Sequence, residues 1–494
     1  ADRLLSGRVV AGTDRPEPES TAARAVAVCL SLALVWVVAA RLFVGIGFNP
    51  TDDGLVVIQS SQLVDGATPH VDIISPRPLG SPLLHVVDVL LPTPLLVTSR
   101  AIALIEFLVI AAAGVRLLQR KPLGRWGPSE IALTLIAFMV NLHTFPLLSW
   151  HTVDGLLLST LAFVVLDKAF TEQSARLLRV GLLLAGATPL IKQSFAPVPL
   201  IVIVWMVWTL RSGRSPFSRR ALLANLPWGL APGVAYLGWL VVTSSLSQAI
   251  SQMTSASGID ATAGLVVTAP SLVALGATVV LVWAVVVGRR RNPAGPDPAR
   301  LTTALQVAGA ALIVLALSAT FSGQLRYTES WGAVLWWASA MTACLWSVAD
   351  RRVDIPAVAI LALGWMTSLS WGYPVPNLMG GLLLVAAVSR GLLLIEVGLG
   401  PARGVTLARA TTALVVVVCV ALAPMSIWAR NQTVYRDVPA SRSVDLGPLA
   451  PDFRGVRAGK MTARYLEQIK QCTAQYPATN LAVVPDNAAV PRLL

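Results

Sequence analysis

Long runs without a charged side chain are the feature that most constrains the fold of this 494-residue chain. Four such runs cover residues 131–153, 261–288, 301–325 and 355–389. A helix needs about 20 consecutive apolar residues to cross a bilayer. Charged residues make up only 13% of the chain, against about 25% in soluble domains, and apolar residues make up 55%. The sequence therefore excludes a soluble enzyme, a disulfide scaffold and a disordered chain, and it predicts an all-α polytopic membrane protein.

The apolar runs predict about 13 transmembrane helices, and the first of them follows a polar stretch at residues 13–21. We therefore expect the first helix to be retained rather than cleaved as a signal peptide. The predicted spans are residues 25–44, 98–118, 129–149, 153–170, 178–192, 195–210, 221–244, 263–288, 301–320, 331–349, 355–371, 378–398 and 405–428.

Basic residues lie mainly on one side of this predicted topology. The N-terminal segment and the short loops on its side hold 24 Lys and Arg residues, and the opposite loops hold five. Such loops face the cytoplasm in most membrane proteins. We therefore expect a cytoplasmic N-terminus and an extracytoplasmic C-terminus, and we attribute the net charge of +13 to topology rather than to nucleic-acid binding. The Arg-heavy, Ala/Val-rich composition indicates a bacterial plasma membrane protein.

Two segments on the expected outer side are more polar than the connectors. Residues 45–97 form a long first outer loop inside the membrane domain (residues 1–428), and residues 429–494 form an extracytoplasmic segment. Helical periodicity at residues 461–472 and an apolar stretch at residues 481–484 predict a helix and a short strand. We expect this C-terminal α/β segment to be a truncated or minimal domain.

The first outer loop is rich in carboxylates. Asp52 and Asp53 follow an Asn-Pro-Thr turn signal, so either side chain is a candidate cap for a short amphipathic helix over residues 54–64. Proline residues then stiffen the return of the chain to the membrane. We expect Asp65 and Asp88 to face solvent. The pattern predicts that carboxylates are presented from a rigid frame near the membrane surface.

The order of motifs in this loop resembles the first outer loop of GT-C-fold glycosyltransferases, of the protein-mannosyltransferase and aminoarabinose-transferase type. Those enzymes show Asp-Glu, a short helix, Gly-x-x-Pro-Tyr-x-Asp and Pro-Lys-Pro-Pro-Gly. The resemblance covers about 30 residues, and Asp53, His70 and Arg77 stand where Glu, Tyr and Lys are common. The matching residues here are Asp52-Asp53, Gly66, Pro69-His70, Asp72 and Pro76-Arg77-Pro78-Leu79-Gly80, followed later by Gly186 and Lys192-Gln193.

This resemblance implies a polyprenyl-phosphate sugar donor and an envelope glycan, lipid or protein acceptor, with inversion at the anomeric carbon. A carboxylate must take the proton of the attacking hydroxyl, and cations must stabilise the departing phosphate. Asp52 is accordingly the expected catalytic base, and Asp53 its catalytic partner or a metal ligand. The candidates for binding the donor phosphate are Arg77, Lys192 and Arg326.

Other residues are candidates for the sugar or acceptor pocket, and each has a simpler reading. Asp72 could be a turn residue, Lys192 could extend its amine to the membrane surface, and the aromatic residues could belong to the interfacial belt. No cofactor is assigned; a divalent cation, if bound, would take Asp52, Asp53 and Asp72. The pocket candidates are Asp72, His70, His151, Trp150, Gln193 and Tyr373.

Two other functions are open on the sequence alone. A membrane transporter or lipid flippase without transferase chemistry predicts functional charges inside spans, and Glu106 and Asp167 are the two that the sequence offers. The sequence shows no internal repeat of the kind that many transporters carry. A non-catalytic scaffold would instead use residues 429–494 to bind partners.

Overall fold

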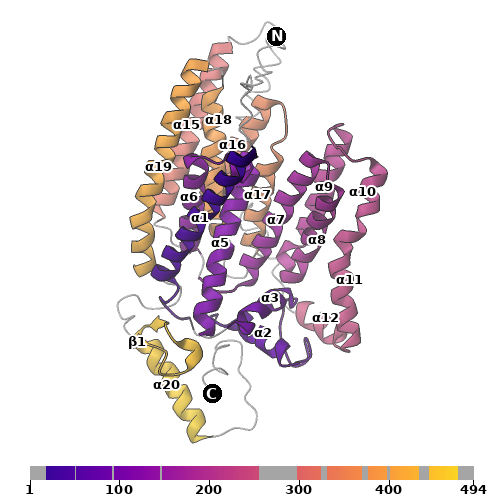
Figure 1. The fold of residues 1–494 in the computed structure, drawn as a ribbon, viewed down its shortest axis with the longest axis vertical. Coiled ribbons are helices and arrows are strands. Elements are labelled where there is room, and N and C mark those ends of the chain that lie inside the picture. Colours follow the sequence, from indigo (N-terminus) through magenta and orange to yellow (C-terminus); the bar gives the residue numbers. More distant parts are fainter. Residues whose placement is uncertain are drawn as a thin grey trace.

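The long helices of the protein run roughly parallel along one axis in a computed structural model (Figure 1). The structure describes residues 18–49, 52–91, 94–144, 147–254, 277, 298–323, 331–369, 376–397, 401–432 and 444–476. One group of helices packs around α5 and α18, and α7 to α12 form a second group beside it. The first group comprises α1 (Pro18–Phe43), α5 (Leu95–Gln119), α6 (Pro128–Thr144), α15 (Pro298–Ser322), α16 (Trp331–Asp350), α17 (Ile355–Ser368), α18 (Gly380–Glu396) and α19 (Pro401–Gln432).

The second group packs on the first through the contact between α5 and α7. Its helices are α7 (His151–Glu172), α8 (Ala175–Ile191), α9 (Pro197–Arg211), α10 (Arg219–Asn225), α11 (Pro227–Val242) and α12 (Leu246–Thr254). Gly186 of α8 lies so close to the Gly229 carbonyl of α11 that a Cβ would not fit. Small residues at such positions allow membrane helices to approach closely.

Seven of the described helices are long and apolar enough to cross a membrane, or eight if the bent pair of 219–242 and α12 forms one further span. The prediction of a helical protein with several membrane-spanning helices is thus confirmed. A described helix lies at each of the predicted spans except 263–288, of which the structure describes only residue 277. Some of these helices are short, however: α6 and α8 have 17 residues each and α17 has 14.

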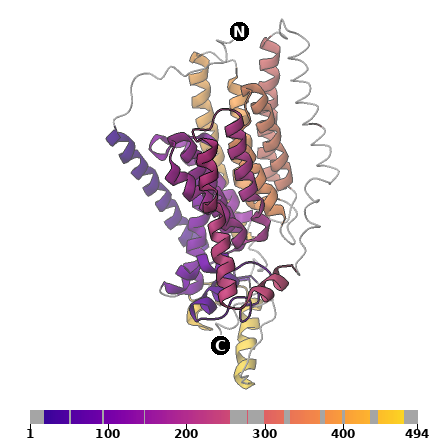
Figure 2. The ribbon, with the colours of Figure 1, turned by 90° about the vertical axis from the view of Figure 1, so that its right-hand side faces the viewer.

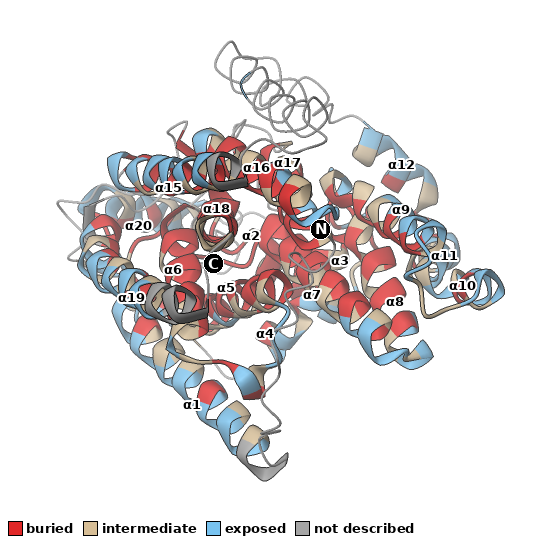
Figure 3. Ribbon diagram, turned by 90° about the horizontal axis from the view of Figure 1, so that it is seen from above, coloured by how far each residue is buried: buried red, intermediate tan, exposed pale blue. Residues whose placement is uncertain are grey.

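Burial separates the helices that face lipid from those that form the core. Seen along the bundle, α18 is buried on all sides, whereas α1 and α19 expose most of their outer faces (Figure 3). In the most apolar 18-residue window of each helix, 83% of the residues are buried within 377–396, against 17% in α1 and in α19. The exposed faces are apolar, as Leu30 and Val420 illustrate. Such faces suit a hydrocarbon environment.

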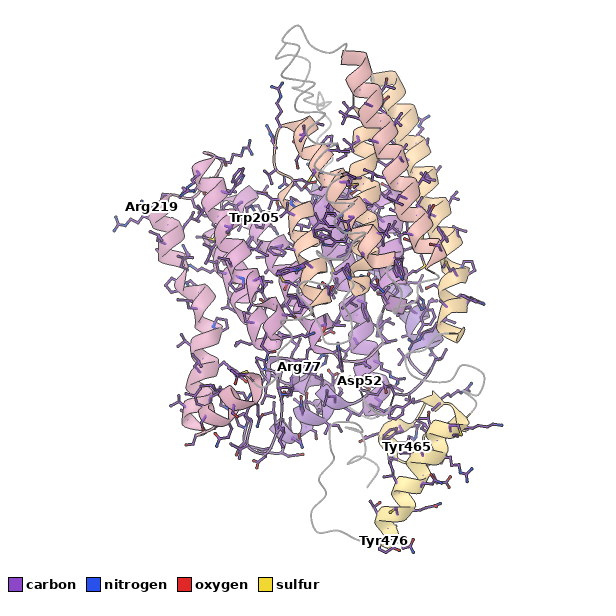
Figure 4. The ribbon with its side chains drawn as sticks, turned by 180° about the vertical axis from the view of Figure 1, so that it is seen from behind. Asp52, Arg77, Trp205, Arg219, Tyr465 and Tyr476 are labelled. Carbon is purple, nitrogen blue, oxygen red and sulfur yellow. The ribbon has the colours of Figure 1, made fainter. Side chains whose placement is uncertain are left out.

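The two ends of the bundle differ in character. Arg219 lies at one end, and Asp52 and Arg77 lie at the other (Figure 4). We call these the Arg219 end and the Asp52 end. Arg390 is buried in α18, where its Nη2 lies 3.0 Å from Oδ1 of Asp354, the residue that caps the start of α17.

The first outer loop folds into three short helices at the Asp52 end. The helix predicted over residues 54–64 is present as α2 (Leu55–Val64), and α3 (Gly80–Leu84) and α4 (Val86–Leu90) follow it. The α2 helix packs on both α3 and α4. This loop is therefore a compact part of the fold.

The C-terminal unit covers the start of this loop. It consists of β1 (Val444–Asp445), which pairs antiparallel with β2 (Arg457–Ala458), and α20 (Lys460–Gln475). The predicted helix is confirmed by α20, which extends beyond the bundle (Figure 2); the strand predicted at residues 481–484 lies outside the described residues.

Backbone and side chains both anchor the unit. The Arg457 N–H donates to the Gly45 carbonyl at 2.8 Å, and the Arg457 carbonyl accepts from the Gly47 N–H at 2.8 Å. The rings of Phe48 and Phe453 pack edge to face with centroids 5.3 Å apart. The last described segment of the chain thus fixes the residues that lead into Asp52.

Candidate functional site

Asp53 is a buried anchor of the first outer loop. Its Oδ2 accepts hydrogen bonds from the Asn49 N–H at 2.7 Å and from Arg100 Nη2 at 2.9 Å. Arg100, on α5, also donates to the carbonyls of Val44 and Gly47. These bonds make Asp53 an anchor of the loop, and its predicted role as catalytic partner or metal ligand stays a prediction.

Asp52 lies beside this anchor and is partly exposed. The Asn49 side-chain amide donates to Asp52 Oδ2 at 2.9 Å. The helix α2 begins after Gly54, whose φ of 87° lies in the left-handed region that favours glycine, and no side chain caps it. The expectation that Asp52 or Asp53 caps this helix is therefore wrong, and Asp52 keeps an orientation set by Asn49.

Arg77 comes together with two predicted pocket residues at the start of α7. Its Nη1 lies 3.3 Å from His151 Nδ1, and its guanidinium carbon lies 5.4 Å from the centre of the Trp150 ring. Burial lowers the pKa of Arg77, and the negative charge of Asp52 opposes that shift. Asp52 and Arg77 are therefore within electrostatic range of each other.

Lys192 and Gln193 complete this group from the end of α8. The buried amine of Lys192 donates to Thr152 Oγ1 at 2.9 Å, and Gln193 Nε2 donates to the Pro76 carbonyl at 2.7 Å. Thr152 directly follows His151 in the chain, and Pro76 directly precedes Arg77. Both bonds therefore connect the end of α8 to the residues around Arg77. We call Arg77, Trp150, His151 and Lys192 the cation cluster.

His151 contributes a hydrogen-bond donor to this cluster. Since arginine can only donate, His151 Nδ1 accepts from Arg77, and the imidazole proton lies on Nε2. The Nε2 atom is buried and has no hydrogen-bond partner among the described residues. A buried N–H without a partner costs free energy, so this atom is suited to donating to a bound ligand.

Close packing explains why the last residue of the Pro-Arg-Pro-Leu-Gly motif is a glycine. Gly80 begins α3 directly against the Leu190 carbonyl at the end of α8, and a Cβ would not fit between them. Next to it, the hydroxyl of Ser75 accepts from the Arg77 N–H at 3.2 Å and donates to the Arg77 carbonyl at 2.9 Å. The close approach and the tight turn together bring Arg77 towards Lys192.

His70 lies away from the cation cluster and links the loop to α11 and α12. It is fully buried, with Nε2 2.9 Å from the Tyr236 hydroxyl and Nδ1 3.2 Å from Gln252 Oε1. Gln252 also donates to the His70 carbonyl and accepts from the Ser75 N–H. Burial lowers the pKa of His70, and the closed network makes it a structural residue. No local signal in the sequence pointed to Gln252, which lies in a different part of the chain.

Asp72 is a turn residue, which is the simpler of the two alternatives that the sequence offered for it. It is exposed, and its Oδ2 accepts from the Thr68 N–H at 2.7 Å, as in a turn. Asp52, Asp53 and Asp72 do not form a metal-binding group among the described residues. Arg326 and Tyr373 lie outside the described residues, so their predicted roles stay predictions.

The sequence did not predict a second polar cluster that the structure contains. Asp88, expected to face solvent, is fully buried, and its Oδ2 lies 3.0 Å from His85 Nδ1. Glu106 and Asp154 lie on the other side of the same imidazole. The signals that could have revealed it were the i, i+3 spacing of His85 and Asp88 and the carboxylates within apolar helices.

An open, largely apolar groove lies at the end of α2. It has a volume of about 550 Å³ and is lined by residues of α2, α3, α4 and α11, including Leu63, Leu83, Val86 and Trp239. Thr68 and Pro69, which immediately precede His70, also line it. The groove is open enough and apolar enough to accept part of a lipid chain.

Comparisons with protein-family profiles, with curated proteins and with solved structures found no match to this chain. The residues and geometry described above therefore carry the functional argument. The fold and the site define a helical membrane protein with cations and a carboxylate gathered at one end.

Proposed function

We propose that this protein is an integral-membrane, inverting glycosyltransferase of GT-C type, with about 13 spans in a bacterial plasma membrane. It transfers a sugar from a polyprenyl-phosphate carrier to an envelope glycan, lipid or protein on the extracytoplasmic side, where the Asp52 end lies. The supporting observation is that Arg77 and Lys192, distant in sequence, bond to the adjacent residues His151 and Thr152, with Asp52 close enough to act on Arg77.

The cation cluster suits a lipid phosphate. The buried amine of Lys192 and the buried, unpartnered N–H of His151 lie in one group with the partly buried guanidinium of Arg77. Preorganised cations and donors stabilise charge that develops on a leaving group. The ring of Trp150 offers an apolar face to a sugar, since aromatic faces pack well against apolar surfaces.

Asp52 is the base in this proposal. It takes the proton of the acceptor hydroxyl as that oxygen bonds to the anomeric carbon. The bond from the anomeric carbon to the phosphate oxygen breaks, and the carrier phosphate leaves with the electron pair. A single displacement of this kind inverts the anomeric configuration. Asp52 is partly exposed, unlike the buried Asp53, so an acceptor can reach it.

A transfer assay tests the proposal. The full chain in liposomes is incubated with a panel of polyprenyl-phosphate sugars, and Asp52→Asn is compared with Asp65→Asn, which changes an exposed carboxylate of the same loop. We expect Asp52→Asn to lower the transfer rate by about 10²–10⁴-fold, as for loss of a general base, and Asp65→Asn to leave it unchanged. Equal transfer by wild type and Asp52→Asn would refute the assigned base.

The phosphate site has its own test. Lys192→Met and Arg77→Gln are expected to raise the KM for the donor, because each removes a positive charge from the cation cluster. The acceptor KM should change less. Unchanged donor KM in both variants would contradict the assignment of these residues to the phosphate.

One observation favours a transporter or flippase instead. Glu106 lies in the middle of α5 and is buried, and one of its carboxylate oxygens has no hydrogen-bond partner among the described residues. Ionisable groups inside spans often mark ion or proton pathways. A flux assay in liposomes discriminates: a transporter loses flux in Glu106→Gln and keeps it in Asp52→Asn. For a scaffold, deleting residues 429–494 is no longer diagnostic, because this segment anchors the loop that carries Asp52.

A further inference from the structure

A buried polar cluster lies beside the middle of α5, and none of its residues belongs to the cation cluster. It consists of His85, Asp88, Glu106 and Asp154, which are all at most 6% exposed. Glu106 is 11 residues beyond the start of α5, or about 16 Å along the helix at 1.5 Å per residue. The short helices α3 and α4, which flank His85, therefore reach well down the side of α5.

Three side chains of the cluster converge on one point. His85 Nε2 lies 3.1 Å from Asp154 Oδ1 and 3.8 Å from Glu106 Oε1. The three ligand atoms all lie within 4.8 Å of one another. A metal about 2.0–2.2 Å from each nitrogen or oxygen ligand places the ligands roughly 3–4 Å apart. The spacing of these atoms matches a coordination site.

Two carboxylate oxygens of the cluster are buried without partners. Glu106 Oε2 and Asp88 Oδ1 have no hydrogen-bond partner among the described residues. Within the same part of the chain, no Lys or Arg forms an ion pair with Asp88, Glu106 or Asp154. His85 supplies at most one positive charge to the three carboxylates, and buried carboxylates without full compensation are strongly unfavourable. The cluster therefore has an excess of negative charge that a cation would balance.

The neighbours of the cluster resemble the surroundings of metal sites. Asp88 Oδ2 lies 3.0 Å from His85 Nδ1 and accepts a further bond from Ser149 at 3.3 Å. A histidine that binds a metal usually donates its other N–H to a carboxylate, which fixes the tautomer. Asp88 has this position at His85 Nδ1, whereas His85 Nε2 hydrogen-bonds to Asp154 Oδ1 in the structure and is the nitrogen that would bind an ion once it has lost its proton. Ser81 in turn donates to Asp154.

We propose that His85, Glu106 and Asp154 bind one divalent transition-metal ion, Zn²⁺ or Mn²⁺, and that Asp88 orients His85. One imidazole nitrogen with two carboxylates favours these ions over Ca²⁺ and Mg²⁺, which prefer oxygen ligands alone. The ion joins the α3–α4 turn to α5 and α7. The proposed metal site does not depend on the proposed sugar transfer, because none of its ligands belongs to the cation cluster.

Metal content measures the site directly. The purified full chain is stripped with a chelator, loaded with ZnCl₂ or MnCl₂, and desalted; retained metal is then quantified by mass spectrometry. We expect about one ion per chain and a higher Tm in the loaded protein. The EPR spectrum of free Mn²⁺ should also disappear when the ion binds to the protein.

Variants locate the ion. Glu106→Gln keeps the shape of the side chain and removes a ligand, so we expect at least about 10-fold weaker binding. The control is Asp167→Asn, which changes another buried carboxyl, one paired with Arg116 and Arg120 at the Arg219 end. Asp88→Asn leaves all three ligands in place and should weaken binding by about 10–100-fold.

The result that overturns the proposal is equally specific. No retained Zn²⁺ or Mn²⁺ in the wild type, or equal retention in Glu106→Gln, would refute the site. Preferential retention of Ca²⁺ or Mg²⁺ would refute the assigned class of ion. If Glu106→Gln is not monodisperse, Asp88→Asn decides the location, and the stoichiometry of the wild type decides the existence of the site.

Discussion

Arg100 Nη2 lies 2.9 Å from Asp53 Oδ2, and both side chains are buried. The pair joins α5 to the loop that carries Asp52. Two adjacent aspartates therefore have different environments, because Asp53 is buried in this pair and Asp52 is partly exposed.

Asp53→Asn should destabilise the protein. Removing one partner of a buried ion pair leaves an uncompensated charge and costs about 3–5 kcal/mol, so we expect a lower Tm for thermal unfolding in detergent. Asp65→Asn, at an exposed position of the same loop, is the control and should keep the wild-type Tm. A wild-type Tm combined with loss of transfer in Asp53→Asn would instead indicate a direct catalytic role.

Gly80→Ala should separate Arg77 from Lys192. The added methyl group would collide with the Leu190 carbonyl, so α3 must move away from the end of α8. We expect a lower Tm and weaker donor binding. Gly233→Ala is the matched control, because nothing lies within 4 Å of the added carbon and alanine favours helices by about 1 kcal/mol over glycine. Equal behaviour of the two variants would contradict this packing argument.

Phe453→Ala should loosen the segment that leads into Asp52. The substitution removes the ring that packs on Phe48, and loss of a buried phenylalanine costs about 3–5 kcal/mol. Hydrogen exchange at residues 44–49 is expected to become faster. Tyr476→Ala, at a position 67% exposed at the end of α20, should leave exchange unchanged. Slow exchange in Phe453→Ala would show that the C-terminal unit does not hold this segment.

Acid pH should loosen the link between the first outer loop and α12. Burial lowers the pKa of His70 in the folded protein, so the unfolded state, with a pKa near 6.5, binds the proton more readily. The stabilising contribution is therefore complete above about pH 6.5 and decreases as the pH falls below that value. Hydrogen exchange at residues 66–79, corrected for the intrinsic effect of pH, measures this.

The control for this pH effect is His70→Asn. Asparagine tolerates the positive φ of 56° at this position and does not titrate, so its exchange should depend less on pH. An equal pH dependence in the variant would assign the effect to another group.

The membrane helices could be predicted because their signal is local. Runs such as 301–320 and 405–428 are apolar over a full span, and the structure has α15 and α19 there. The same holds for α2, which glycine and proline residues delimit. Placement of the cap failed because the chain enters α2 through the left-handed conformation of Gly54 rather than through an aspartate.

The site could be predicted only in part, because its partners come from distant segments. The sequence predicted three site residues from separate motifs, namely Arg77, His151 and Lys192, and the structure brings them together. By contrast, the burial of Asp88 depends on contacts with Ser149 and His85, and that of His70 on Gln252. A carboxylate or imidazole in a polar loop gives no local sign of such partners.

The pairing of Arg457 with Gly45 and Gly47 has a consequence for biosynthesis. Residues 45–47 emerge from the ribosome early, yet their backbone partners are made more than 400 residues later. The segment that leads into Asp52 therefore acquires this support only after all the membrane helices between it and Arg457 have been synthesised. A chain that ends before Arg457 would lack both backbone bonds to the segment that leads into Asp52.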